Sequence, residues 1–124
     1  KQVGTAFSES NGAFTTSKLG VYRVYVEYHI QLLTANGTRY IQLDTKFTPN
    51  GGSAIGGDIY GSTAYIQNDT TYDQHVRTRI YNFNHVNDSV SFRAASQYNI
   101  RIRGGGSTEF DTLVLFEWLA PPVA

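Results

Sequence analysis

One segment, from Gly20 to Ile30, alternates apolar and polar side chains almost without a break, and it constrains the fold more than any other feature. A β-strand produces a period of two, because neighbouring side chains leave the strand on opposite faces. The segment therefore predicts a long strand with one apolar face. Its apolar set is Tyr22, Val24, Val26, Tyr28 and Ile30, and the set between them is Arg23, Tyr25, Glu27 and His29.

The remaining segments also have the composition of strands. Glycines gather in clusters, the chain has three prolines, and the stretches between are rich in Val, Ile, Thr, Tyr and Phe. Further strands are predicted at Thr38–Phe47, Gln74–Phe83, Ser89–Ala95 and Phe110–Leu119. No segment keeps a helical period over three turns, so seven to nine short strands are expected to form one all-β sandwich domain over residues 1–124.

Turn signals suggest how these strands connect. Asn36-Gly37 lies between the first two predicted strands and favours a tight hairpin, so we expect Gly20–Ile30 and Thr38–Phe47 to pair antiparallel. The glycine-dense stretch Asn50–Ser62 predicts a long surface loop with a short strand around Ile59. Asn87-Asp88 predicts a turn. Phe110–Leu119 is the most apolar stretch, which is typical of a central strand partly buried on both faces.

Composition narrows the classes of function. Ten basic and ten acidic residues give a net charge of zero, so neither nucleic acid nor an anionic membrane is an expected partner. Apolar runs are far shorter than the roughly 20 residues that cross a bilayer, so membrane insertion is not expected. Cysteine is absent, which removes disulfides and thiolate sites, and methionine is absent even at position 1. We expect the chain to be the C-terminal part of a longer protein.

Catalytic and metal-binding patterns are missing from the sequence. His29, His75 and His85 are isolated, and neither a His-Xaa-His pair nor a Gly-Xaa-Ser-Xaa-Gly motif occurs. The glycines at 104–106 are not followed by the Lys-Ser/Thr pair of a phosphate-binding loop. We therefore expect no enzyme activity, no cofactor and no metal site.

Spacing near the N-terminus resembles the signature of the complement C1q and tumour necrosis factor (TNF) superfamily. Six residues separate Phe7 from Phe14, and five separate Phe14 from Gly20. This spacing, with Tyr22 after the glycine, matches the signature of the family. The family usually has aromatic residues where this chain has Val24 and Val26, and Asn or Asp where it has Gln2, so the resemblance is to a distant member.

Two further motifs follow in the family's order. Val86–Phe92 resembles a Gly-Asp turn and the strand after it, with Asn87 in the place of the glycine. Thr108–Phe116 resembles the closing strand, with Thr112 where the family has glycine. The resemblance covers about positions 7–116.

This resemblance implies a ten-stranded antiparallel jelly-roll sandwich that assembles as a homotrimer. The layer between its sheets would contain Phe14, Tyr22, Val24, Val26, Tyr28, Phe92, Phe110, Val114 and Phe116. The opposite face of one sheet would pack against neighbouring subunits, and bulky residues on both faces of one strand are hard to explain in a monomer. The residues assigned to the trimer interface are Tyr25, Arg77, Arg79, Tyr81, Phe83, Leu113 and Leu115.

The interleaved basic and aromatic residues of His75–Phe83 could also line a groove for single-stranded nucleic acid. Arg77, Arg79, Tyr81 and Phe83 share one strand face, so we favour packing between subunits, with the arginines paired to Glu27 or Glu117.

The expected function is that of a surface-exposed binding head that recognises a receptor protein or a glycan. Three loops are expected to carry specificity: Asn50–Ser62, Asn68–Asp73 and Ser96–Ser107. The residues assigned to partner binding are Ile59, Tyr60, Tyr72, Tyr98, Arg101 and Arg103. The expected location is extracellular or on a particle surface, with a viral or phage spike favoured over a secreted protein or a spore coat.

Two alternative functions remain open at this point. One is a structural jelly-roll subunit of a capsid or coat, whose role is assembly. The other is a monomeric or dimeric carbohydrate-binding module, in which Tyr60, Tyr65, Tyr72 or Tyr98 would stack on sugar rings.

Overall fold

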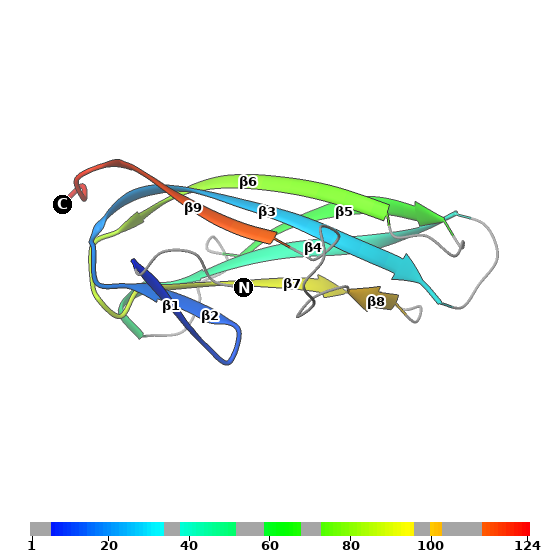
Figure 1. Ribbon diagram of the computed structural model, residues 1–124, viewed down its shortest axis with the longest axis horizontal. Coiled ribbons are helices and arrows are strands. Elements are labelled where there is room, and N and C mark those ends of the chain that lie inside the picture. The colour runs from blue at the N-terminus through cyan, green and yellow to red at the C-terminus, as the bar shows by residue number, and fades with distance from the viewer. Residues whose placement is uncertain (1–5, 34–37, 52–58, 68–72, 96–99, 103–112) are drawn as a thin grey trace.

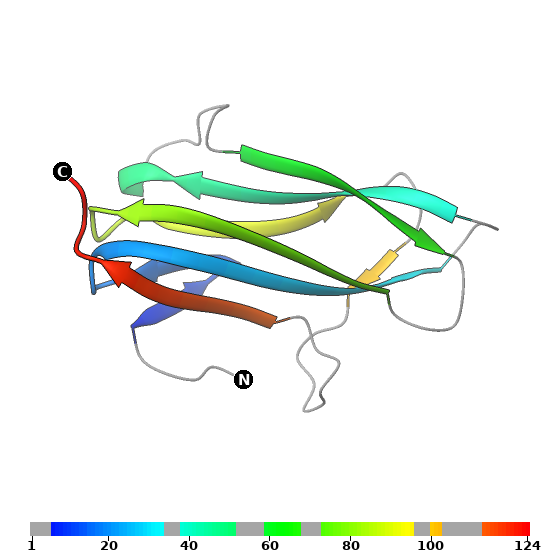
Figure 2. The same ribbon diagram turned by 90° about the horizontal axis from the view of Figure 1, so that it is seen from above.

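The computed structural model describes residues 6–33, 38–51, 59–67, 73–95, 100–102 and 113–124. These residues form two antiparallel sheets that lie face to face, as Figures 1 and 2 show from two directions. The only helical turn among them is a short 3-10 turn, Pro49–Gly51. The predicted all-β fold class is confirmed.

Nine strands lie within the described residues, five in one sheet and four in the other. The five-stranded sheet has the order β1 (Phe7–Ser10), β2 (Ala13–Thr16), β7 (Ser89–Ala95), β4 (Thr38–Thr48), β5 (Ile59–Gln67). The four-stranded sheet has the order β6 (Asp73–Phe83), β3 (Gly20–Leu32), β8 (Ile100–Ile102), and β9 (Leu113–Ala120) also pairs with β3. The expected tenth strand stays a prediction.

The strand pairs are nested around one hairpin. β4 pairs with β5, β3 pairs with β6, and β2 pairs with β7, all antiparallel. Successive strands from β2 to β4, and again from β5 to β7, alternate between the two sheets. The chain is therefore one long antiparallel ribbon that folds over on itself, so that its successive sections become facing layers.

The core lies between the sheets in two adjoining clusters. One contains Val26, Tyr28 and Ile30 of β3 against Ile41 and Leu43 of β4. The other contains Phe7, Tyr22, Val24, Phe83 and Val90. Phe7 stacks on Phe116 with ring centroids 3.8 Å apart and meets Tyr22 edge-on at 4.9 Å.

Most of the predicted core is confirmed. Tyr22, Val24, Val26 and Tyr28 are buried, and half-buried side chains pack against them: Phe14, Phe92, Val114 and Phe116. Phe110 lies outside the described residues.

The predicted hairpin between Gly20–Ile30 and Thr38–Phe47 is wrong. β3 and β4 belong to different sheets, and β4 pairs with β5 on one edge and β7 on the other. Each strand has an apolar face, and stacking the two faces removes both from water, which edge-to-edge pairing alone does not do.

The boundaries of two other predicted segments also change. The short strand predicted around Ile59 is confirmed but is longer, because Ile59 begins β5, which pairs with β4 from Lys46↔Ile59 to Thr38↔Gln67. β9 pairs with no described strand other than β3, and its residues Leu113 and Leu115 are exposed. Within the part of the chain that the structure describes, it is therefore not a central strand, and its outward face is exposed rather than partly buried.

Asp88 holds the predicted turn between β6 and β7, which the structure confirms. The residue is 1% exposed, and its Oδ2 accepts hydrogen bonds from the backbone N–H groups of Asn84 (2.8 Å) and His85 (2.9 Å). Its Oδ1 accepts one from the N–H of Asn50, at 2.7 Å, in the 3-10 turn after β4. One carboxylate thus ties together two connections from different parts of the chain.

Replacing Asp88 with Asn should destabilise the fold. An amide that accepts through Oδ1 turns its NH2 group towards the other donors, so at least one buried N–H loses its acceptor. We expect the free energy of unfolding in Asp88→Asn to fall by about 2–4 kcal/mol, measured by denaturant titration. Asn87, the exposed neighbour of Asp88, serves as the control: in Asn87→Ala the free energy of unfolding should change by less than about 0.5 kcal/mol. Equal stability of the two variants would contradict this role of Asp88.

Trp118 packs directly over Gly20. A Cβ on Gly20 would overlap the indole Nε1 and would lie 2.8 Å from the carbonyl oxygen of Ala120. The indole N–H donates to the carbonyl of Leu19 at 3.4 Å, and Lys18 Nζ lies 4.8 Å from the ring centroid. Gly20 is therefore required because of this close approach.

Gly20→Ala should displace the indole. We expect a loss of about 1–3 kcal/mol in the free energy of unfolding, because the added methyl group overpacks the contact. Trp118 is the only tryptophan, so its fluorescence should also shift to longer wavelength. As a control, Ser17→Ala, at an exposed position nearby, should change neither the free energy of unfolding nor the fluorescence of Trp118. An unaltered fluorescence spectrum in Gly20→Ala would disprove the contact.

The last residues of the chain are tied to β6. The Asn82 side chain donates from Nδ2 to the Val123 carbonyl at 2.7 Å and accepts at Oδ1 from the Val123 N–H at 3.0 Å. The C-terminus therefore lies at the end of the sandwich where β6 turns into β7 (Figure 1).

Candidate interface on the outer face of the four-stranded sheet

Three rows of side chains cross the outer face of the sheet formed by β6, β3 and β9. Since Val24 and Val26 of β3 point into the core, Arg23, Tyr25 and Glu27 point outward. The pairing register places Tyr25 beside Thr78 and Leu115, Glu27 beside Val76 and Leu113, and Arg23 beside Ile80 and Glu117. Cross-strand partners share a face, so all nine side chains belong to one surface.

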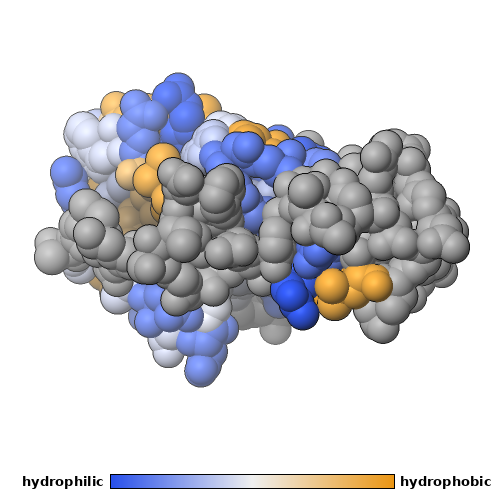
Figure 3. All heavy atoms as spheres, turned by 45° about the vertical axis from the view of Figure 1, so that its right-hand side comes forward, coloured by the Kyte–Doolittle hydropathy of each residue, from blue (hydrophilic) through white to orange (hydrophobic). Residues whose placement is uncertain are grey.

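Apolar groups on this surface are unusually exposed. Leu113 is 42% exposed, Leu115 51%, Val76 40% and Ile80 59%. We call these four residues and the half-buried Tyr25 the outer apolar face. In Figure 3 apolar atoms reach the upper surface, on the side where β6 and β3 lie in Figure 1. Monomeric soluble proteins rarely expose large contiguous apolar patches.

On the outer face of the five-stranded sheet, the described side chains of β1, β2 and β7 and of the second half of β4 are mostly polar. Their cross-strand rows join Ser8 to Thr15 and Thr15 to Ser89. Arg93 Nε donates to Asp44 Oδ2 at 2.9 Å, and Gln42 Nε2 donates to Asp44 Oδ1 at 2.8 Å. This part of the face therefore differs from the outer apolar face.

A short hydrogen-bonded network lies within the outer apolar face. The Tyr25 hydroxyl donates to Glu27 Oε2 at 2.7 Å, and His29 Nε2 lies 2.9 Å from Glu27 Oε1. An ionised carboxylate only accepts, so Nε2 carries a hydrogen in this arrangement. The bond from Tyr25, and then that from His29, lowers the pKa of Glu27, and the same bond to Glu27 raises the pKa of Tyr25. At the rim, Arg23 Nη1 donates to Glu117 Oε2 at 2.7 Å.

The predicted positions of Tyr81 and Phe83 on the outer face are wrong. Phe83 is 0% exposed and belongs to the core, and Tyr81 is half-buried with its ring stacked on Phe47, the centroids 5.1 Å apart. The register explains the error, because Tyr81 pairs with core-facing Tyr22 and therefore shares its face.

Arg77 and Arg79 lie on the same side of β6 as Tyr81. They pair with the core residues Val26 and Val24, and both arginines are partly buried. The prediction that these arginines lie on the outer face is therefore wrong.

The outward residues of β6 are Val76, Thr78 and Ile80, and none of them was predicted to lie on the interface. The alternation along this strand contained the information needed to predict them. Large aromatic side chains such as Tyr81 and Phe83 fill a core better than smaller aliphatic ones, so the residues between them are expected to point outward. Of the residues assigned to the interface, Tyr25, Leu113 and Leu115 lie on the outer face.

The described residues that flank the three loops assigned to partner binding do not all lie at one end of the sandwich. Ile59 lies near the end where Thr48 pairs with Ser89, whereas Gln67 and Asp73 lie at the opposite end. Ala95 and Ile100, which flank the third loop, lie at the same end as Gln67 and Asp73.

Three of the six residues assigned to these loops lie within the described part of the chain. Ile59 and Tyr60 belong to β5, and Arg101 is exposed on β8. Tyr72, Tyr98 and Arg103 lie outside it.

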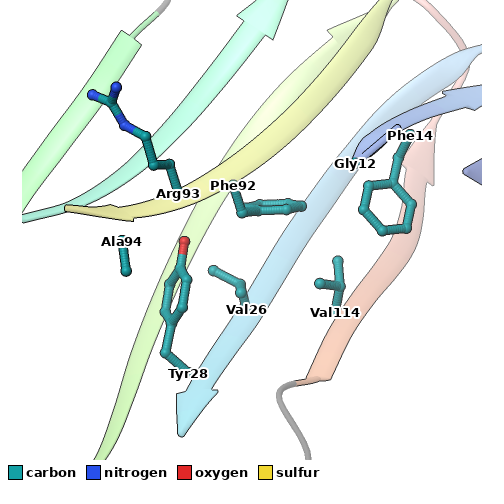
Figure 4. A pocket seen from close by; sticks show the side chains of 8 residues that line it. All are labelled: Gly12, Phe14, Val26, Tyr28, Phe92, Arg93, Ala94 and Val114. Atoms are coloured by element: carbon teal, nitrogen blue, oxygen red, sulfur yellow. The ribbon is translucent and has the colours of Figure 1, made fainter. Parts of the chain in front are cut away.

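A hollow of about 400 Å³ opens between the sheets beside β7 and β9. Figure 4 shows Phe14, Phe92, Val26 and Val114 around it, while the Arg93 side chain points away. The Tyr28 hydroxyl donates a hydrogen bond to the backbone carbonyl of Asp44 at 3.4 Å. The lining thus offers packing but no convergent polar groups.

Within the described ranges, no three His, Asp or Glu side chains come together as a metal site requires. The same residues contain no helix with the length and apolar character needed to cross a membrane.

No family model matches the chain, and neither a curated protein nor a solved structure is significantly similar to it. Its function is therefore inferred from its own geometry and from the motif resemblance.

Proposed function

We propose that the chain is the binding head of a homotrimeric surface protein with a C1q/TNF-like jelly roll, and that it binds rather than catalyses. Its place would be extracellular or on a particle surface, such as a viral or phage spike. Its ligand would be a receptor protein or a glycan.

The topology supports this proposal. A single antiparallel ribbon folded across two facing sheets is how a jelly roll is built, and the nested pairs β4·β5, β3·β6 and β2·β7 have this pattern. Two residues in the motifs that resemble the family also have structural roles in this fold. Gly20 makes room for Trp118, and Asp88 accepts three backbone hydrogen bonds.

The outer apolar face is the observation that carries the proposal. It belongs to the same sheet that the resemblance assigns to subunit contacts, and it lies opposite the core on three adjacent strands. A second copy of the chain is the occupant we propose, because the resemblance assigns this face to subunit contacts and the described outward side chains of β1, β2 and β7 in the other sheet are mostly polar. Recognition would then fall to the ends of the sandwich, which assembly leaves free.

Leu115→Glu should abolish the trimer. A carboxylate at this position would lose its water when a partner covers the face, so we expect association to weaken at least about 100-fold. Sedimentation velocity or light scattering after size exclusion measures this directly. Ile80→Glu, on the other side of Tyr25, should act in the same way.

The matched control is Ser10→Glu, at an exposed position of the five-stranded sheet, which should leave the trimer intact. A wild-type chain that is monomeric at high concentration would overturn the proposal. Pentamers or large shells would favour the coat-subunit alternative, and a monomer or dimer that binds a glycan array would favour the carbohydrate-binding alternative.

A further inference from the structure

Tyr25 occupies the centre of the outer apolar face. It lies on β3, the strand between β6 and β9, and its cross-strand neighbours are Thr78 and Leu115. The other members of the face lie on the two adjacent rows of β6 and β9, diagonal to the Tyr25 side chain and within reach of an aromatic ring. They are Val76, Leu113 and Ile80. Residues that dominate an association are typically Tyr, Trp or Arg near the centre of the contact, surrounded by groups that exclude water.

The Tyr25 side chain is already held in place in the single chain. Its ring is half-buried, and its hydroxyl donates to Glu27 Oε2 at 2.7 Å. Glu27 lies two residues along the same strand and therefore on the same face, and its Oε1 lies 2.9 Å from His29 Nε2. A tyrosine has two side-chain torsions, and a bond at its tip removes freedom that association would otherwise have to restrict. Glu27 thus fixes the ring before a partner arrives.

The same bond determines what it costs to cover the face. The Glu27 side chain is 19% exposed, so water still reaches it in the single chain, and a second copy on this face would exclude that water. The bond from Tyr25 is the largest cause that lowers the pKa of Glu27, so the carboxylate is ionised at neutral pH. Covering an ionised group is costly unless it keeps its hydrogen bonds. Tyr25 supplies one of these donors from within the chain.

We propose that the hydrogen bond between Tyr25 and Glu27 is the specificity-determining element of the outer apolar face. Glu27 is the positioning residue that fixes the ring, and Tyr25 provides the donor that allows a partner to cover Glu27. This inference rests on the proposed function, because it needs a second copy of the chain on this face. The bond should matter more for association than for folding, because only association removes the remaining water from the carboxylate.

Sedimentation equilibrium of the full chain tests whether Tyr25 dominates the contact. Tyr25→Ala should weaken association at least about 100-fold, whereas Leu115→Ala, its neighbour in the same row, should weaken it less than about tenfold. Ser8→Ala, at an exposed position of the five-stranded sheet, should leave association unchanged. Circular dichroism shows whether each variant keeps its β structure.

A double-mutant cycle tests the bond itself. Tyr25→Phe keeps the ring and removes the hydroxyl, so association should weaken at least about tenfold, because Glu27 is then covered with one donor fewer. In a chain that already carries Glu27→Leu, the same replacement should not weaken association, because no carboxylate is left to satisfy. A role in folding alone would not produce this coupling in the association constant.

The outcomes separate this inference from the function on which it rests. The inference would be overturned, and the trimer left standing, if Tyr25→Ala weakened a wild-type trimer no more than Leu115→Ala does. The same holds if Tyr25→Phe keeps wild-type affinity, or weakens association equally with and without Glu27→Leu. A wild-type chain that stays monomeric at high concentration would overturn the proposed function and this inference with it.

Discussion

The burial of one face of β3 against β4 is the contact on which the other elements depend. Val26, Tyr28 and Ile30 meet Ile41 and Leu43 across the sandwich, and this contact fixes which way every other residue of β3 points. The edges of β3 then accept β6 on one side and β8 and β9 on the other. Its outward residues consequently occupy the middle of a broad sheet, where Tyr25 and Glu27 are flanked on both sides.

Periodicity predicted the strands and most of the core, because a period of two specifies a face within one strand. It could not specify the partner. Asn36-Gly37 favoured a local hairpin, yet β4 takes β5 and β7 as neighbours because its apolar face has to meet that of β3. Face assignment failed on β6 for a related reason: alternation gives two sets of residues, and only the register with Tyr22 shows that Tyr81 belongs to the inner one. The outer apolar face was thus predicted on β3 and β9 and missed on β6.

Two carboxylates on the outer faces of the sheets differ in their partners. Asp44 is buried and is bound by the guanidinium of Arg93. Glu27 is partly buried and is bound by the hydroxyl of Tyr25 and by the His29 imidazole. The bond from Tyr25 is the largest cause that lowers the pKa of Glu27. Asp88, in contrast, is held by three backbone N–H groups and has a structural role in joining the turns.

The bond pair between Asn82 and Val123 has a practical consequence for presenting the molecule on a support. Because these bonds hold the terminus beside the turn that follows β6, a tether attached after Ala124 would leave from that end of the sandwich. The last residues of β3, β5 and β7 lie at the other end of the sandwich. A chip or bead coupled after Ala124 would therefore hold the molecule with these three strand ends farthest from the solid surface.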